Sequence, residues 1–247
     1  MRNVTHRILQ IMAMALMTVY FPIVMGFVSA AHSEVECNEI TTKIYGNDNE
    51  VLISAGELSK IVSLSFPDLK GRKLENINLN EIETTIEQNS PAVRRCECYA
   101  TPGGVLHVEI EQRKPIMHVF TSGTSYYMDA EGYRIVSRGD THAYALVVSG
   151  NVGAMLDGTE LIQLCQYIVN DDFWKAQIEQ VYVTDKSEYI LVPRVGNHIV
   201  EFGTIDNMEE KFHNLHTLYT KGWDKMEWNL YKKVNLKYKG QIVCTKK

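Results

Sequence analysis

An apolar run near the amino terminus constrains this chain more than any other feature. The 21 residues of Ile8–Val28 contain no Asp, Glu, Lys or Arg, and a helix of about 20 such residues crosses the core of a bilayer. Arg2 and Arg7 precede the run, and acidic residues follow it. Because basic residues stay on the cytoplasmic side, we expect a cytoplasmic tail at 1–7, a transmembrane helix at 8–28 and a linker at 29–36, with the rest of the chain extracytoplasmic.

A cleaved secretory signal is the competing interpretation of this run. Val28-Ser29-Ala30 before Ala31 has the small residues of a signal cleavage site. Signal peptides have an apolar core of about 7–15 residues, which is shorter than this run. An uncleaved anchor is therefore favoured, and cleavage remains the alternative.

Charge and cysteine content narrow the range of partners. Without Arg2 and Arg7 the chain carries 23 basic and 30 acidic residues, a net charge of −7. A mildly acidic protein is a poor candidate for nucleic-acid binding.

The odd number of cysteines in an exported chain does not indicate a disulfide framework. We expect buried thiols, with one bridge from Cys37 to Cys96 or Cys98 as the alternative and no pairing assigned among the five: Cys37, Cys96, Cys98, Cys165 and Cys244.

Residues 37–114 have the pattern of a compact β-α-α-β-β module. Ser54 with Glu57 forms a capping box that begins one helix, and Asn78 begins a second. The alternation over Val105–Glu111 is typical of a half-buried antiparallel strand. The other expected strands are Ile40–Ile44, Val51–Ile53 and Val93–Tyr99.

Residues 115–247 predict a second domain, a mixed and mostly antiparallel β domain with two helices. Apolar residues at helical spacing place those helices at Leu161–Ile168 and Phe212–Tyr219. The last strands are expected at Val234–Tyr238 and Ile242–Cys244. The fold class is therefore α+β, with a single amino-terminal transmembrane helix followed by two domains.

The sequence contains no recognisable reaction centre. It lacks the nucleophile-elbow, phosphate-loop, dinucleotide-binding and H-E-x-x-H patterns. His213 and His216 share a helix face but have no further ligand at zinc spacing, so a solvated pair is favoured. The three tryptophans, Trp174, Trp223 and Trp228, are interpreted as packing residues rather than as the lining of a sugar or peptide site. We expect no enzyme activity, no cofactor and no metal, and infer an interaction protein.

The order of parts resembles the FtsQ/DivIB family of bacterial cell-division proteins. Val108–Pro115 is similar to the strand and proline that close the family's POTRA domain, and Tyr127–Gly132 to the turn that opens its β domain. Three further segments resemble members of that family from Bacteroides-like bacteria: Asp172–Trp174, Pro193–His198 and Phe202-Gly203.

The resemblance implies a non-enzymatic divisome scaffold in the inner membrane at the division site. Such a protein binds the small division proteins FtsB and FtsL through the last strand of its β domain, and meets other divisome membrane proteins. The partner-contact positions fall on Lys237, where an Arg is more usual, and on Tyr238 and Gly240. The resemblance implies that the partner binds by adding a strand to the edge of the sheet. Two other functions are weighed: a periplasmic binding protein or envelope hydrolase with a cleaved signal, and a POTRA-bearing outer-membrane assembly protein, which would need a long barrel.

Overall fold

The computed structural model describes residues 12, 14–24, 35–46, 50–121, 123–136, 142–154, 159–223 and 227–247. Residues 14–24 are helical with exposed apolar side chains. Among the described helices, none combines the length and the apolar character that crossing a membrane requires. The expected span at 8–28 extends beyond the described helix at both ends, and the expected tail at 1–7 and most of the linker lie outside the described residues.

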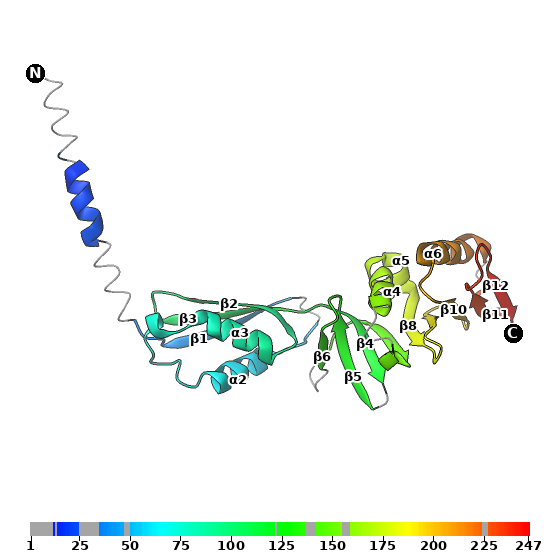
Figure 1. Cartoon of the computed structure of the whole chain (residues 1–247), viewed down its shortest axis with the longest axis horizontal. Coiled ribbons are helices and arrows are strands. Elements are labelled where there is room, and N and C mark those ends of the chain that lie inside the picture. Colours follow the sequence, from blue (N-terminus) through cyan, green and yellow to red (C-terminus); the bar gives the residue numbers. More distant parts are fainter. Residues whose placement is uncertain are drawn as a thin grey trace, which may run out of the picture. The chain divides into compact units, whose positions relative to one another are not determined.

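The rest of the chain forms two compact units (Figure 1). The first contains residues up to Tyr45 together with Ser54–Glu111, and the second contains Gly46–Ile53 and Gln112–Lys247. Each unit has its own sheet. They are described separately below.

The first unit has a three-stranded sheet with two helices on one face. Its sheet order is β1-β3-β2, with β1 parallel to β3. The predicted β-α-α-β-β order is confirmed. In chain order the elements are β1 (Glu39–Tyr45), α2 (Ala55–Ser65), a 3₁₀ turn (Leu74–Asn76), α3 (Leu79–Asn89), β2 (Val93–Ala100) and β3 (Val105–Gln112).

Both helices of the first unit begin at the predicted caps. The Ser54 hydroxyl accepts the Glu57 backbone N–H at 3.1 Å, and the Asn78 side chain accepts that of Glu81 at 3.2 Å. Each bond satisfies one of the free amides of a first helical turn. On β3, alternate side chains are fully buried against the helices, as the sequence pattern predicts: Leu106, Val108 and Ile110.

One strand assignment in this region was wrong. Val51–Ile53 is not a strand of the first unit but belongs to the second. Val51 forms an isolated antiparallel bridge with His142, with backbone N–H···O distances of 2.8 and 2.9 Å in the two directions. A short apolar triplet carries no information about which sheet it will join, so this pairing could not be read from sequence.

The second unit is built on a nine-stranded mixed sheet of order β12-β11-β10-β9-β8-β7-β4-β5-β6. Antiparallel pairs outnumber parallel pairs, which are β4–β7, β7–β8 and β10–β11. The strands are β4 (Pro115–Thr121), β5 (Thr124–Asp129), β6 (Arg134–Val136), β7 (Leu146–Gly150), β8 (Ile178–Val183), β9 (Tyr189–Pro193), β10 (Ile199–Gly203), β11 (Tyr231–Asn235) and β12 (Val243–Lys246).

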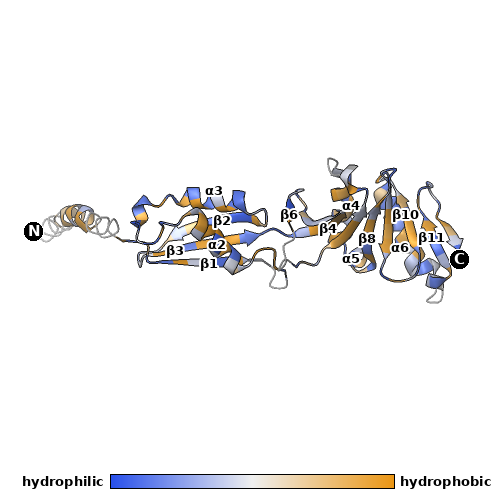
Figure 2. Ribbon diagram, turned by 90° about the horizontal axis from the view of Figure 1, so that it is seen from below, coloured by the Kyte–Doolittle hydropathy of each residue, from blue (hydrophilic) through white to orange (hydrophobic). Residues whose placement is uncertain are grey.

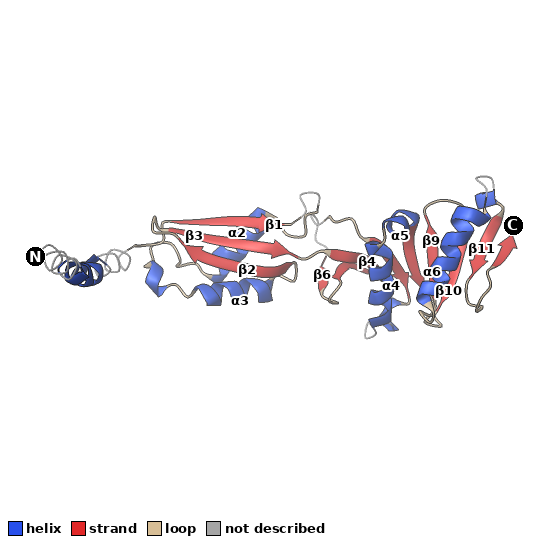
Figure 3. Ribbon diagram, turned by 90° about the horizontal axis from the view of Figure 1, so that it is seen from above, coloured by secondary structure: helices blue, strands red, loops and turns tan. Residues whose placement is uncertain are grey.

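The helices of the second unit pack on one face of this sheet (Figures 1 and 3). They are α4 (Thr159–Asn170), α5 (Asp172–Gln177), α6 (Met208–Thr217), a π-helical turn (Leu218–Gly222) and two 3₁₀ turns (Val152–Ala154 and Glu227–Asn229). Two helices were expected, and α5 is an addition to them. Asp171 caps α5 by accepting the Trp174 backbone N–H at 3.0 Å.

The core of the second unit lies between the helices and the sheet. Figure 2 shows apolar residues following its central strands. Trp174 and Trp223 are buried and Trp228 is partly buried against this core, which confirms their assignment as packing residues.

A buried ion pair fixes the β5–β6 turn of the second unit. Arg113 Nη1 lies 2.8 Å from Asp129 Oδ2, and Asp129 Oδ1 accepts the backbone N–H groups of Glu131 and Tyr133 at 3.0 and 2.8 Å. The Arg113 guanidinium also stacks 3.7 Å from the centre of the Tyr133 ring. Gly132, with φ +85°, completes the turn in a conformation that L-residues rarely adopt.

Candidate partner-binding surface

The candidate surface is the terminal hairpin, which comprises β11, the loop 236–242 and β12. β12 pairs with β11 and is last in the sheet order, so it is an edge strand within the described chain. It is only four residues long, and Val243 is 42% exposed. An edge strand presents a row of backbone N–H and C=O groups that another strand can pair with.

Glu201 on β10 holds the hairpin to the rest of the sheet. One carboxylate oxygen lies 2.7 Å from Lys233 Nζ, and the other accepts the Asn235 side-chain amide at 2.9 Å. Its backbone carbonyl accepts the N–H of Leu236 at 3.0 Å. A single residue thus fixes the register of β11 against β10 through three contacts.

The loop after β11 is shaped by side-chain and backbone turns. Asn235 Oδ1 accepts the Lys237 backbone N–H at 2.9 Å, which bends the chain away from β11. Lys237 then places its ammonium against the Glu188 carboxylate, and its aliphatic stem passes Gly203. Gly240 has φ +71° with open space around it, so the backbone conformation, rather than crowding, favours glycine there.

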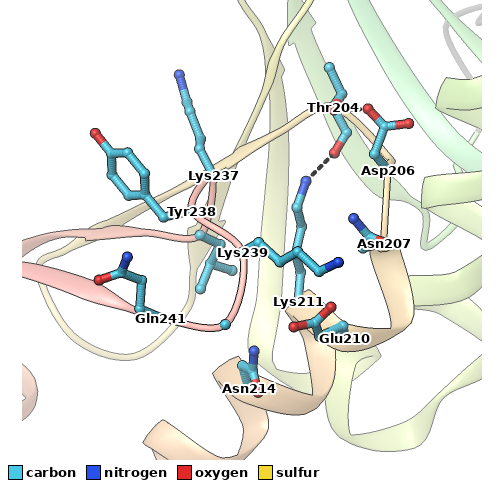
Figure 4. A pocket seen from close by; sticks show the side chains of 12 residues that line it. Thr204, Asp206, Asn207, Glu210, Lys211, Asn214, Lys237, Tyr238, Lys239 and Gln241 are labelled. Atoms are coloured by element: carbon cyan, nitrogen blue, oxygen red, sulfur yellow. Dashed lines mark hydrogen bonds between the residues drawn. The ribbon is translucent and has the colours of Figure 1, made fainter.

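A hollow of about 250 Å³ lies between this loop and the start of α6 (Figure 4). Lys211 spans its floor and donates to the Thr204 backbone carbonyl at 2.7 Å. Burial lowers the pKa of the Lys211 ammonium. Polar side chains dominate the lining, and the residues from the hairpin loop are Leu236, Lys237, Tyr238, Lys239, Gly240 and Gln241.

An aromatic cluster supports the hairpin from within. His198 is 2% exposed, and its Nε2 lies 2.7 Å from the Tyr219 hydroxyl. The Trp223 ring packs edge-on against His198 and stacks on Tyr231 of β11 at 5.1 Å. Burial lowers the pKa of His198 to about 4, which favours the neutral ring at neutral pH. The π-helical turn that carries Tyr219 is thereby tied to β11.

The structure brings the three expected contact residues together. Lys237, Tyr238 and Gly240 line the same hollow, and Tyr238 is 55% exposed. They lie in a loop, however, and the predicted strand at Val234–Tyr238 was wrong: β11 ends at Asn235, and the last strand is β12. Asn235 ends the strand by capping Lys237, which explains the difference.

Several residues of this surface were missed by sequence reasoning. Glu201, Glu188 and Lys211 lie far from the hairpin in the sequence and reach it only through the sheet. By contrast, the turn that ends β11 has a local sequence signal, because the Asn in Asn235-Leu236-Lys237 favours a side-chain turn.

Within the described ranges, no group of three or more His, Cys, Asp or Glu residues could hold a metal ion. All five cysteines are free; four are buried, and Cys244 is partly exposed on β12. His213 and His216 are exposed on α6, where His216 packs edge-on against Phe173 at 4.6 Å.

The fold and this surface define a two-domain protein with a strand edge at the end of its larger sheet. Residues 35–111 match a POTRA-like domain, and residues 114–245 match a domain described as FtsQ/DivIB, C-terminal related. No curated protein matches the chain. Because the second match covers more than half of the 247 residues, the chain belongs to the FtsQ/DivIB-related family, whose members are generally non-enzymatic scaffolds.

Proposed function

We propose that this chain is a non-enzymatic division scaffold of the Bacteroides-like FtsQ type that binds FtsB and FtsL-like small proteins through its terminal hairpin. Membership of the FtsQ/DivIB-related family supports a division role. The observation that carries the proposal is the β12 edge beside the exposed loop with Lys237, Tyr238 and Gly240. The partner adds a strand to β12, and its flanking side chains contact the loop.

The charge of the hairpin region supports an acidic partner segment. Residues 221–247 contain eight lysines and two acidic residues, whereas the whole chain has a net charge of −5. Lys246 and Lys239 are exposed beside the β12 edge. Opposite charge on a partner would accelerate its association and fix its orientation on the edge.

We further propose that the apolar run at 8–28 anchors the scaffold in the inner membrane, with the amino terminus cytoplasmic and both units in the periplasm at the division site. The absence of charged residues in the run and the two arginines before it support this orientation. The domain bounds are proposed as 37–114 and 115–247. Other divisome membrane proteins are the expected partners of the first domain.

The test is a calorimetric titration of the full chain, in mild detergent, with the exported segment of FtsB from the same cell. We expect saturable one-to-one binding that Tyr238→Glu abolishes. Val136→Glu is the matched control, because Val136 is 58% exposed on β6, the edge strand at the other end of the sheet. Hydrogen exchange of the complex should show new protection at Val243–Lys246.

Two outcomes would reject the proposal. One is the absence of binding by a chain whose folding is verified by circular dichroism. The other is binding that Tyr238→Glu and Val136→Glu affect equally, since that would place the contact away from the hairpin.

A further inference from the structure

Two amides on the outer side of the β2 edge of the first unit are already satisfied by side chains. β2 lies at one edge of the sheet, so one side of its backbone faces no strand. Two successive outward N–H groups nevertheless have strong acceptors. The Cys96 N–H donates to Glu87 Oε1 at 2.8 Å, and the Cys98 N–H donates to Glu83 Oε1 at 2.7 Å.

The residue spacing along a helix matches the spacing along a strand at these positions. Residues four apart on a helix are separated by about 6 Å along its axis, and alternate residues of a strand by about 6.6 Å. Glu83 and Glu87 on α3 therefore meet consecutive outward amides of β2, which runs alongside the helix (Figure 3). Ile82 and Ile86 are 1% and 0% exposed, so their packing fixes the position of α3.

We propose that Glu83 and Glu87 replace a neighbouring strand and close the β2 edge against pairing with a second copy of this chain. Charged acceptors bind amides about twice as strongly as neutral ones, so an incoming strand would exchange two charge-assisted bonds for two ordinary ones. The carboxylates also repel the carbonyl oxygens of such a strand. Strand pairing is thereby directed to other edges of the molecule.

The side chains behind this edge provide a direct readout. Cys96 and Cys98 are 4% and 8% exposed, and their sulfur atoms lie 3.9 Å apart beneath α3. The hydrogen bond between the two thiols, together with burial, raises the pKa of Cys98. Both thiols are shielded from reagents while the helix covers them. Separation of α3 from β2 would expose them to alkylation.

The test compares three variants of the full chain: Glu83→Ala/Glu87→Ala, Glu83→Gln/Glu87→Gln, and Gln88→Ala as a control for an exposed position on the same helix. In the alanine pair we expect the amides of residues 96 and 98 to exchange about tenfold faster or more, and faster alkylation of Cys96 and Cys98 mapped by mass spectrometry. Sedimentation should show a concentration-dependent dimer. The glutamine pair keeps a carbonyl acceptor but loses the charge, so its amide exchange and its dimerisation should lie between those of the parent chain and those of the alanine pair.

Three results would overturn the proposal. In the first, the amides of the alanine pair exchange at the parent rate. In the second, those amides exchange quickly but the protein sediments as the parent does, so the carboxylates guard nothing. In the third, the glutamine pair behaves like the alanine pair. If the alanine pair fails to fold, Glu87→Ala alone decides: it must accelerate exchange at Cys96 and leave Cys98 unchanged.

Discussion

Replacing Asp129 by alanine tests whether a buried charge pair holds the entry of the second unit. Asp129 and Arg113 side chains are 7% and 10% exposed, with 2.8 Å between Asp129 Oδ2 and Arg113 Nη1. The substitution removes that contact and the acceptor for two backbone N–H groups of the β5–β6 turn. Within the described part of the chain, Glu131 is then the carboxylate partner that Arg113 retains, and the Glu131 side chain is 52% exposed.

The expected loss in the free energy of unfolding is large for a single substitution. Removal of one member of a buried ion pair costs about 3–5 kcal/mol, because the remaining charge stays buried. Asp129→Asn keeps an oxygen for the turn amides and loses only the charge, so about 1.5–3 kcal/mol is expected from the weaker bond to Arg113. Arg113→Met/Asp129→Leu removes both charges and should cost less than Asp129→Ala.

Urea unfolding followed by tryptophan fluorescence measures these losses. All three tryptophans lie in the second unit, so the signal reports that unit alone. The reasoning is refuted if Asp129→Ala costs less than about 1 kcal/mol, the level of an exposed pair. It is also refuted if Arg113→Met/Asp129→Leu costs the sum of Arg113→Met and Asp129→Leu made separately, because independent sites add.

Three further predictions concern burial, capping and backbone shape. Burial holds the pKa of His198 at about 4 against 6.5 for a free side chain, so the unfolded chain binds a proton first. The second unit should therefore lose up to about 3 kcal/mol as pH falls from 6.5 to 4, and urea midpoints for His198→Gln should show a smaller loss. Ser54→Ala and Asn78→Ala should each weaken the first unit by about 1 kcal/mol, seen as faster amide exchange in α2 and α3 respectively. A Cβ at Gly150 would lie 2.1 Å from the Val183 carbonyl oxygen, so Gly150→Ala should lower the melting temperature of the second unit clearly, whereas Gly153→Ala, with nothing within 4 Å, should not.

Local sequence signals predicted the first unit well because its elements begin and end on local chemistry. Ser54 and Asn78 cap helices through bonds that span three residues, and the alternation on β3 needs only one buried face. The same kind of signal located α4 and α6. The Val51–Ile53 triplet failed because its partner, His142, lies in another part of the chain.

The candidate surface differs in shape from the one expected, and its role in partner binding stays a prediction. Lys237 and Tyr238 were expected on a strand, and the turn made by Asn235 puts them in a loop. The contacts that hold that loop in position are long-range: Glu201 lies on β10, beside β11, and Glu188 lies directly before β9, one strand further along the sheet. No spacing rule within the hairpin contains that information.

The parallel pairing of β10 with β11 has a consequence for the order of assembly during synthesis. β12 touches the sheet only through β11, and β11 needs β10 and the crossover through α6 before it can dock. Synthesis proceeds from the amino terminus, so β11 and β12 are the last described strands of the second unit to become available for pairing. A chain stalled or cut before Tyr231 would keep most of its sheet and expose β10 as the edge instead, without the lysine-rich loop. A partner could then bind at β12 only after the whole second unit has been synthesised.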